Sequence, residues 1–236
     1  MLLYYITDRN GFAGTVAQQQ SAVIRRIADA AHAGVDYIQL REKDLSAREL
    51  ERLDRGAVNA VRDNSSTTRL LINARTDVAL ACGADGVHLP SGEIAASEVR
   101  ALWRRCSGRQ PLIGVSAHSY DEVRQAKADG ADFVVLAPVF EKVQTSAPGI
   151  GLAALRKACS EAADSRPGEL FDSARFAVLA LGGVNLANAG ACLEAGASGI
   201  AGIRLFQTGD VAETVRQLRE IAQQVTRWQQ SLRSHQ

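Results

Sequence analysis

Polar side chains recur directly after apolar runs of strand length in this sequence. The run "YIQL" is followed by Arg41–Lys43, "RLLIN" ends in Asn73, and "PLIGVS" brings in Ser116, with His118 two residues later. Arginine and lysine bind anionic groups, and the imidazole of histidine ordinarily titrates close to neutral pH. These residue types predict a site that binds an anionic small molecule and moves a proton, with His118 as the acid–base candidate.

Arg41 and Lys43 are expected on one side of the chain and Glu42 on the other, because side chains alternate along a strand. One interpretation is a solvated surface pair with Glu42 or Asp44, which is the usual fate of such charge runs. Their position at a strand end instead favours binding of an anion or substrate, and Arg41 could also pair with Asp8.

Two glycine-containing stretches predict a phosphate site. Gly182–Gly183 follows the run "FAVLAL", and Gly202–Ile203 with Arg204 ends the run "GIAG". Glycine lets a phosphate approach bare backbone N–H groups, and Arg204 could add a positive charge. A glycine that serves only a tight turn remains the alternative. His88 lies within an apolar run, so we expect a hydrogen-bonded interior residue there and not a catalyst.

The elements that must position these residues follow a regular order. A phrase with an Ala-rich helix end, a glycine and a short apolar run occurs four times, near residues 32–41, 82–89, 128–136 and 195–202. Four further apolar runs lie between these copies, and helical patterns follow each run. Strict alternation of eight strands and helices predicts a single-domain (β/α)8 TIM barrel over residues 1–236, with a doubly wound sheet as the alternative. Residues 161–175 are expected to form an extended connection between the sixth helix and the seventh strand.

Composition limits the classes of partner. The chain carries 27 Lys and Arg against 26 Asp and Glu, so no long-range field favours nucleic acid or an anionic membrane. No apolar run approaches the length of a membrane span, and the expected location is the cytoplasm. The four cysteines are far apart, which predicts reduced and mostly buried thiols. A homo-oligomer is compatible with the sequence.

Several stretches together resemble the thiamin phosphate synthase/TenI superfamily. They are "YYITDR", "YIQLREKD", "LLIN", "GADGVHL", "GVSAHSYDEV", "GADFVVLAPVF", "ALGGVN" and "GIAGIRLF", and they cover residues 2–206 in order. The resemblance implies a (β/α)8 enzyme of thiamin (vitamin B1) biosynthesis that binds a thiazole phosphate at the barrel mouth. Residues 207–236 would then form the last barrel helix and a tail.

The superfamily has two branches, and this chain departs from the synthase pattern. Synthases hold Mg²⁺ with aspartates, but here Ala74 follows Asn73 where the pattern has an aspartate, and Glu93 stands at the second carboxylate position. Mg²⁺ demands near-ideal octahedral geometry, which a longer glutamate arm would disturb. After the sixth strand, Lys142 replaces a threonine of the synthase pattern. No metal site is therefore expected, unless Glu93 holds Mg²⁺ in a synthase.

The resemblance favours a TenI-like thiazole tautomerase that needs no cofactor. In this reading His118 moves the proton, and two sets of residues bind the small phosphate substrate. A synthase that couples hydroxymethylpyrimidine diphosphate to thiazole phosphate with Mg²⁺ is one alternative, and a non-catalytic binding or regulatory protein is another. The substrate-binding set is Arg41, Lys43, Asn73, Ser116 and Lys142, and the phosphate-binding set is Gly182, Gly183, Gly202, Ile203 and Arg204.

Overall fold

Eight parallel strands close into a barrel in the computed structural model, which describes residues 1–141, 148–163 and 176–233. Each strand pairs with the next in the chain, and β8 pairs with β1. The (β/α)8 fold class is confirmed. The strands are β1 (Leu2–Ile6), β2 (Tyr37–Leu40), β3 (Arg69–Asn73), β4 (Gly86–Leu89), β5 (Leu112–Ala117), β6 (Phe133–Leu136), β7 (Ala177–Ala180) and β8 (Gly199–Gly202).

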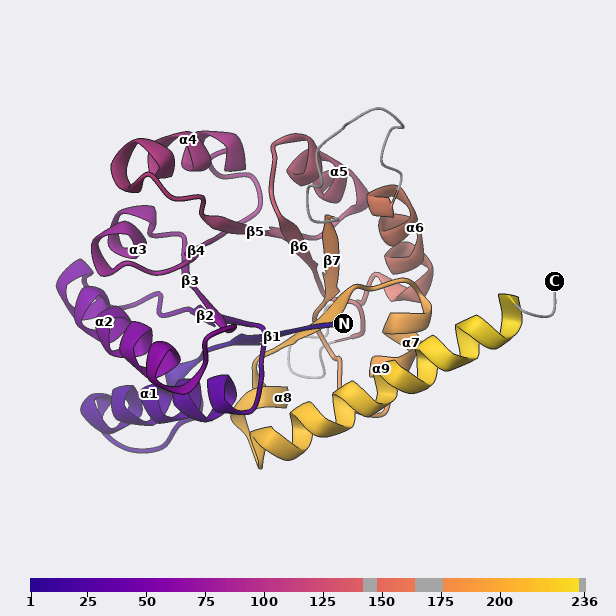
Figure 1. The fold of residues 1–236 in the computed structure, drawn as a ribbon, viewed down its shortest axis with the longest axis horizontal. Coiled ribbons are helices and arrows are strands. Elements are labelled where there is room, and N and C mark those ends of the chain that lie inside the picture. Colours follow the sequence, from indigo (N-terminus) through magenta and orange to yellow (C-terminus); the bar gives the residue numbers. More distant parts are fainter. Residues whose placement is uncertain (142–147, 164–175, 234–236) are drawn as a thin grey trace.

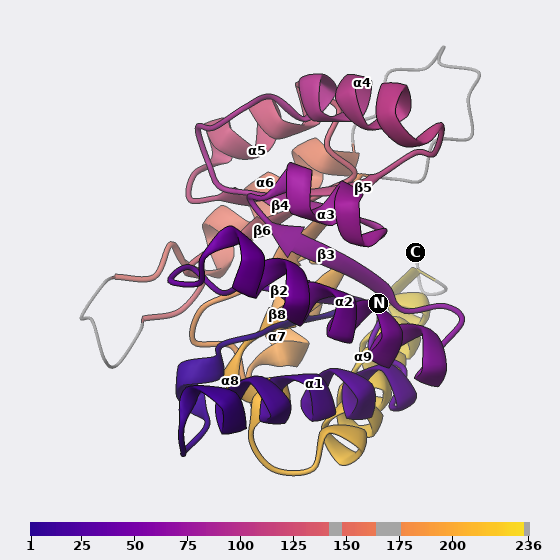
Figure 2. The same ribbon diagram turned by 90° about the vertical axis from the view of Figure 1, so that its left-hand side faces the viewer.

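Helices surround the barrel, and α1, α2 and α3 cover the side turned toward the viewer in Figure 2 (Figures 1 and 2). Two short elements, η1 (Arg9–Gly11) and α8, were not expected from the sequence. The predicted connection at 161–175 lies mostly outside the described residues. The α-helices are α1 (Val16–His32), α2 (Ala47–Asn64), α3 (Thr76–Cys82), α4 (Ala96–Ser107), α5 (Tyr120–Ala128), α6 (Gly151–Ala163), α7 (Ala189–Glu194), α8 (Arg204–Gln207) and α9 (Val211–Arg233).

Alternation along the strands divides the buried apolar side chains into two clusters. The larger cluster lies between the strands and the helices, and it includes Ile38, Leu40 and Trp103. The smaller one fills the barrel interior with Tyr4, Leu71, Phe133, Val135 and Leu179 among others. Because side chains fill the barrel, a ligand can only bind beyond the strand ends.

The fourfold sequence phrase has a structural cause at the N-terminal rim of the barrel. The residue just before each of β2, β4 and β6 is an aspartate whose carboxylate accepts a backbone N–H from the preceding strand. These bonds join β1 to β2, β3 to β4 and β5 to β6. Each carboxylate also pairs with an arginine. Before β8 the equivalent residue is Ser198, whose own N–H donates to the Val178 carbonyl at 2.8 Å. The three hydrogen bonds from a backbone N–H to an aspartate carboxylate are Leu3 to Asp36 at 2.7 Å, Leu70 to Asp85 at 2.9 Å and Ile113 to Asp132 at 2.7 Å.

Helix starts follow the local sequence in part. Thr15 and Ser46 form capping boxes with Gln18 and Glu49 at the starts of α1 and α2. At α3 the threonine is not a cap, because Thr76 is the first residue of the helix and no side chain caps its start. Within the described chain, none of the helices has the length and apolar character needed to cross a bilayer.

Candidate functional site

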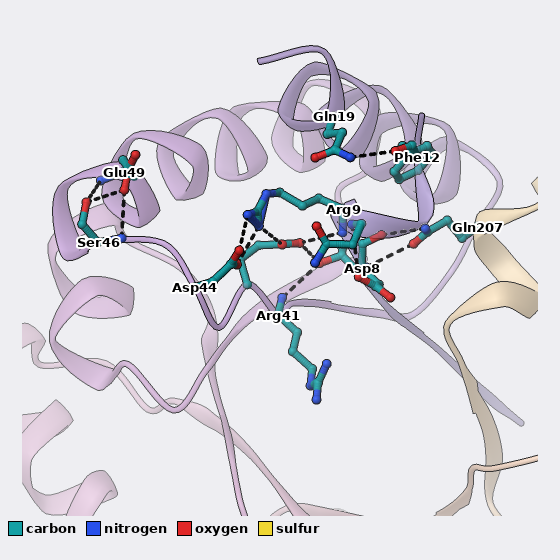
Figure 3. Close-up of polar contacts among 12 residues, drawn as sticks. Asp8, Arg9, Phe12, Gln19, Arg41, Asp44, Ser46, Glu49 and Gln207 are labelled. Atoms are coloured by element: carbon teal, nitrogen blue, oxygen red, sulfur yellow. Dashed lines mark hydrogen bonds and ion pairs between the residues drawn. The ribbon is translucent and has the colours of Figure 1, made fainter. Parts of the chain in front are cut away.

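An ion network of buried Arg9 and Glu42 and exposed Asp44 joins the ends of β1 and β2. The guanidinium of Arg9 lies 3.2 Å from the Glu42 carboxylate and 2.7 Å from Asp44 (Figure 3). Arg9 and Glu42 are 5% and 8% exposed, and burial raises the pKa of Glu42. Thr7 donates its hydroxyl to Glu42 and accepts the Arg41 N–H at 3.0 Å. These contacts fix the backbone from which Arg41 extends.

Arg41 points away from this network and toward the barrel (Figure 3). Burial lowers the pKa of His88, and the positive charge of Arg41 adds to this effect. No ion pair joins Arg41 to Asp8 in the described part of the chain, and the nearby carboxylates of Glu42 and Asp44 pair with Arg9. Lys43 is exposed and lies beyond β2. The possible pairing with Asp8 is not formed, and Arg41 remains available to an anion.

Asn73 ends β3 beside a polar residue that the sequence reading overlooked. Gln39, which is 1% exposed, donates its amide to the Asn73 side-chain oxygen at 2.9 Å. This bond leaves the Asn73 NH₂ group as a donor at the mouth. The next residue, Ala74, has a φ of +60°, a conformation that alanine rarely adopts.

His118 follows β5 and is held by two hydrogen bonds. Its Nδ1 lies 2.8 Å from the Ala137 carbonyl, and its backbone N–H donates to Glu122 at 2.9 Å. A carbonyl can only accept, so Nδ1 carries the proton and Nε2 of the neutral ring is a free acceptor. The same Glu122 oxygen accepts the Ser91 hydroxyl at 2.5 Å. The loops after β4 and β5 are thus tied together beneath an exposed imidazole.

Ser116 is bonded to His88, which is 3% exposed in β4. The two side chains are 2.9 Å apart, and the other ring nitrogen of His88 lies 3.1 Å from the Tyr4 hydroxyl. This arrangement agrees with the expectation of a hydrogen-bonded interior histidine.

The five residues predicted to bind phosphate line one pocket of about 440 Å³ after β7 and β8. The N–H groups of Gly183 and Arg204 make no backbone hydrogen bond in the described residues, which leaves them available to an anion. The alternative role in turns also holds for the glycine pair. Both have positive φ, and a Cβ would lie 2.6 Å from Pro138 at Gly182 and 2.7 Å from Phe140 at Gly183.

The structure gathers most predicted site residues after the carboxyl ends of the strands, while Lys142 lies outside the described residues. Sequence reasoning missed the contributions of Gln39, Arg9, Glu122 and Tyr4. Gln39 could have been found as a polar residue inside an apolar run. Arg9 and Tyr4 could not, because their partners lie 33 or more positions away in the sequence, and Glu122 could not, because it lies in α5 and not at a strand end.

Comparisons with known proteins agree with this architecture. The family model described as thiamine monophosphate synthase matches residues 3–206. The thiamine-phosphate synthase of Moorella thermoacetica is 36% identical over 192 residues, covering 80% of this chain and 82% of that protein. That of Methanoculleus marisnigri is 38% identical over 223 residues, covering 92% and 93%.

A solved structure supports the same assignment. Thiamine phosphate pyrophosphorylase from Pyrococcus furiosus superimposes with a TM-score of 0.72 at 29% identity, covering 95% of this chain and 96% of that one. The fold and the sequence relatives point the same way. The chain therefore belongs to the thiamine monophosphate synthase family of enzymes.

Proposed function

We propose that this enzyme binds a thiazole phosphate at the barrel mouth and catalyses a TenI-like tautomerisation. The observation that carries the proposal is the orientation of the His118 ring. Its Nδ1 proton is held by the Ala137 carbonyl, which leaves Nε2 of this exposed residue as the base that would act on a ligand bound at the mouth. The pocket after β7 and β8 would hold the phosphate, with Arg204 adding a charge.

The tautomerisation needs only proton transfer. His118 Nε2 would accept a proton from one position of the thiazole, and the resulting imidazolium would return a proton to another. The numbers of protons and electrons are unchanged, so no redox partner is required. Arg41 and Lys43 would stabilise the negative charge that develops on the ligand between the two transfers. Asn73 and Ser116 would donate hydrogen bonds that orient it.

The mouth has few side chains that could hold Mg²⁺. The two carboxylate positions of the synthase pattern are Ala74, which has no ligand atom, and Glu93, which is exposed. The Asn73 side-chain oxygen already accepts from Gln39. Among the described residues, no group of three or more His, Cys, Asp or Glu side chains could hold a metal ion. This donor set does not fit a protein-held Mg²⁺, and the proposed reaction uses none.

Thiamine-phosphate synthesis is the second candidate, because the relatives carry that name. Arg41 and Lys43 suit a diphosphate group as well as a carboxylate. In this alternative Mg²⁺ would have to be held largely by the substrate diphosphate and water, with Glu93 as the nearest candidate carboxylate of the synthase pattern.

One assay pair separates the candidates. We expect the purified enzyme to aromatise the non-aromatic tautomer of thiazole phosphate carboxylate in the presence of EDTA, followed by NMR. His118→Ala should slow this conversion by at least about 100-fold, the usual contribution of a general acid–base group. His32→Ala removes an exposed histidine of α1 and should have no effect.

The second assay supplies hydroxymethylpyrimidine diphosphate and thiazole phosphate with and without Mg²⁺. Robust Mg²⁺-dependent formation of thiamin phosphate, with no tautomerisation, would refute the leading proposal in favour of synthesis. Binding of thiazole phosphate without either reaction would show a binding protein instead.

A further inference from the structure

A chain of hydrogen bonds leads from the closed barrel interior to the mouth. Tyr4 of β1 is fully buried, and its hydroxyl lies 3.1 Å from His88 Nδ1. His88 Nε2 in turn lies 2.9 Å from the Ser116 hydroxyl oxygen. Neither Tyr4 nor His88 lines the phosphate pocket, and the proposed reaction gives them no role.

The barrel is built to admit the His88 ring. Gly114 lies beside it in β5, where a Cβ would come within 2.8 Å of His88 Nδ1 and 2.3 Å of the Phe133 ring. The rings of Tyr4 and Phe133 pack edge to face, with centroids 5.4 Å apart. The imidazole is therefore held by packing as well as by its two hydrogen bonds.

Burial decides the direction of these hydrogen bonds. A buried hydroxyl proton requires an acceptor, and His88 Nδ1 is the partner of the Tyr4 hydroxyl among the described residues. Burial, together with the charge of Arg41, lowers the pKa of His88 to about 3, so its ring is neutral. A neutral imidazole has one donor and one acceptor. If Tyr4 donates to Nδ1, then Nε2 carries the proton and donates to Ser116.

The tautomer of His88 decides the direction of the Ser116 hydroxyl proton. Its oxygen accepts from His88, and its own proton must point elsewhere. Ser116 is half-buried near the end of β5, the strand that pairs with β4, which carries His88. Arg41 extends from the end of β2 toward the barrel and brings a positive charge to the mouth (Figure 3). The free proton and the positive charge together suit an anionic oxygen.

We propose that Tyr4 and His88 are positioning residues that fix Ser116 as a one-way hydrogen-bond donor to an anionic oxygen of the bound ligand. This inference rests on the proposed function only in placing the ligand at the mouth. The oxygen can belong to a carboxylate on the thiazole or to a diphosphate, and both offer the same acceptor chemistry. His88 itself carries no proton to or from the ligand.

The protein without ligand provides the first test. Long-range ¹H–¹⁵N spectra of protein labelled at the histidine nitrogens should show His88 with its proton on Nε2, unchanged from pH 5 to 9. His118 in its neutral form should show the opposite tautomer, which gives an internal comparison. A proton on His88 Nδ1, or titration of His88 within this range, would overturn the proposal whatever reaction the enzyme catalyses.

Ligand binding provides the second test, by calorimetry with three probes: thiazole phosphate with its carboxylate, the same compound without it, and inorganic pyrophosphate. Ser116→Ala should weaken binding of the correct anionic probe by about 10- to 100-fold, the range for a hydrogen bond to a charged group. The carboxylate source predicts this loss for the first probe alone, and the diphosphate source predicts it for pyrophosphate. Equal losses for all three, including the probe without carboxylate, would contradict the proposal.

Tyr4→Phe separates positioning from simple packing. The ring is kept, but His88 Nδ1 loses its donor and the tautomer is no longer fixed. Binding of the same probe should weaken in Tyr4→Phe, and this loss should vanish when Ser116→Ala is already present. Equal weakening in both backgrounds would mean that Tyr4 has only a structural role. Far-UV circular dichroism confirms that each variant is folded, and the tautomer test stands if one is not.

Discussion

The pH dependence of stability should reveal a buried carboxyl group far from the mouth. Asp54 of α2 is 0% exposed, and neither of its oxygens has a hydrogen-bond partner among the described residues. The thiol of Cys82 lies near enough to influence it, but donates to the Glu51 carbonyl at 3.6 Å. Burial raises the pKa of Asp54 from 3.8 to about 7. The native protein therefore favours the neutral acid.

The sign and size of the effect follow from this shift. A raised pKa gives stability that is fully present below the unfolded value of 3.8 and is lost as the pH rises toward 7. Each pKa unit corresponds to about 1.4 kcal/mol, so the two units between pH 5 and 7 amount to about 3 kcal/mol. Asp54→Asn cannot ionise and should not show this loss.

Urea unfolding of both proteins at pH 5, 6, 7 and 8 measures the difference. The free energy of unfolding of the parent should fall by about 3 kcal/mol relative to Asp54→Asn between pH 5 and 8. Asp63→Asn, which removes an exposed aspartate of the same helix, should leave the profile of the parent unchanged. Parallel profiles for the parent and Asp54→Asn would refute the reasoning.

Two further substitutions test the mouth. Ala74→Gly should raise the free energy of unfolding by about 1 kcal/mol, because the residue has a φ of +60°. Ala101→Gly, at an exposed position of α4, should lower it by a similar amount. A loss at both positions in chemical denaturation would contradict this reasoning. Arg9→Met should lower it by about 3 kcal/mol, because Glu42 stays buried without its cation. Adding Glu42→Gln should recover part of the loss, and no recovery in the double variant would argue against the ion pair.

The fold was accessible from the sequence because its signals are local. A glycine after an Ala-rich helix and an apolar run after that glycine recur with each quarter of the barrel. The carboxyl ends of parallel strands meet at one face, so the strand-end residues Asn73, Ser116 and His118 could be assigned to it from their positions alone.

The contacts within the site were not accessible in the same way. Tyr4 and His88 are 84 positions apart, and only the closure of the barrel brings them together. The choice of Arg9 over Arg41 as the partner of the acidic residues depends on how the chain turns after β1, where η1 was not expected. Two arginines of equal charge are indistinguishable until their directions are known.

The aspartates at the N-terminal rim join strands at one end of the barrel, and the candidate site residues lie at the other end. Asp36, Asp85 and Asp132 hold neighbouring strands together at the end of the barrel opposite the mouth. These three contacts do not involve the residues that follow the strands, so a substitution after a strand can leave the pairing at the N-terminal rim unchanged. Ala74, which follows β3, is such a position, because its side chain can change the chemistry offered at the mouth without touching a contact of the rim.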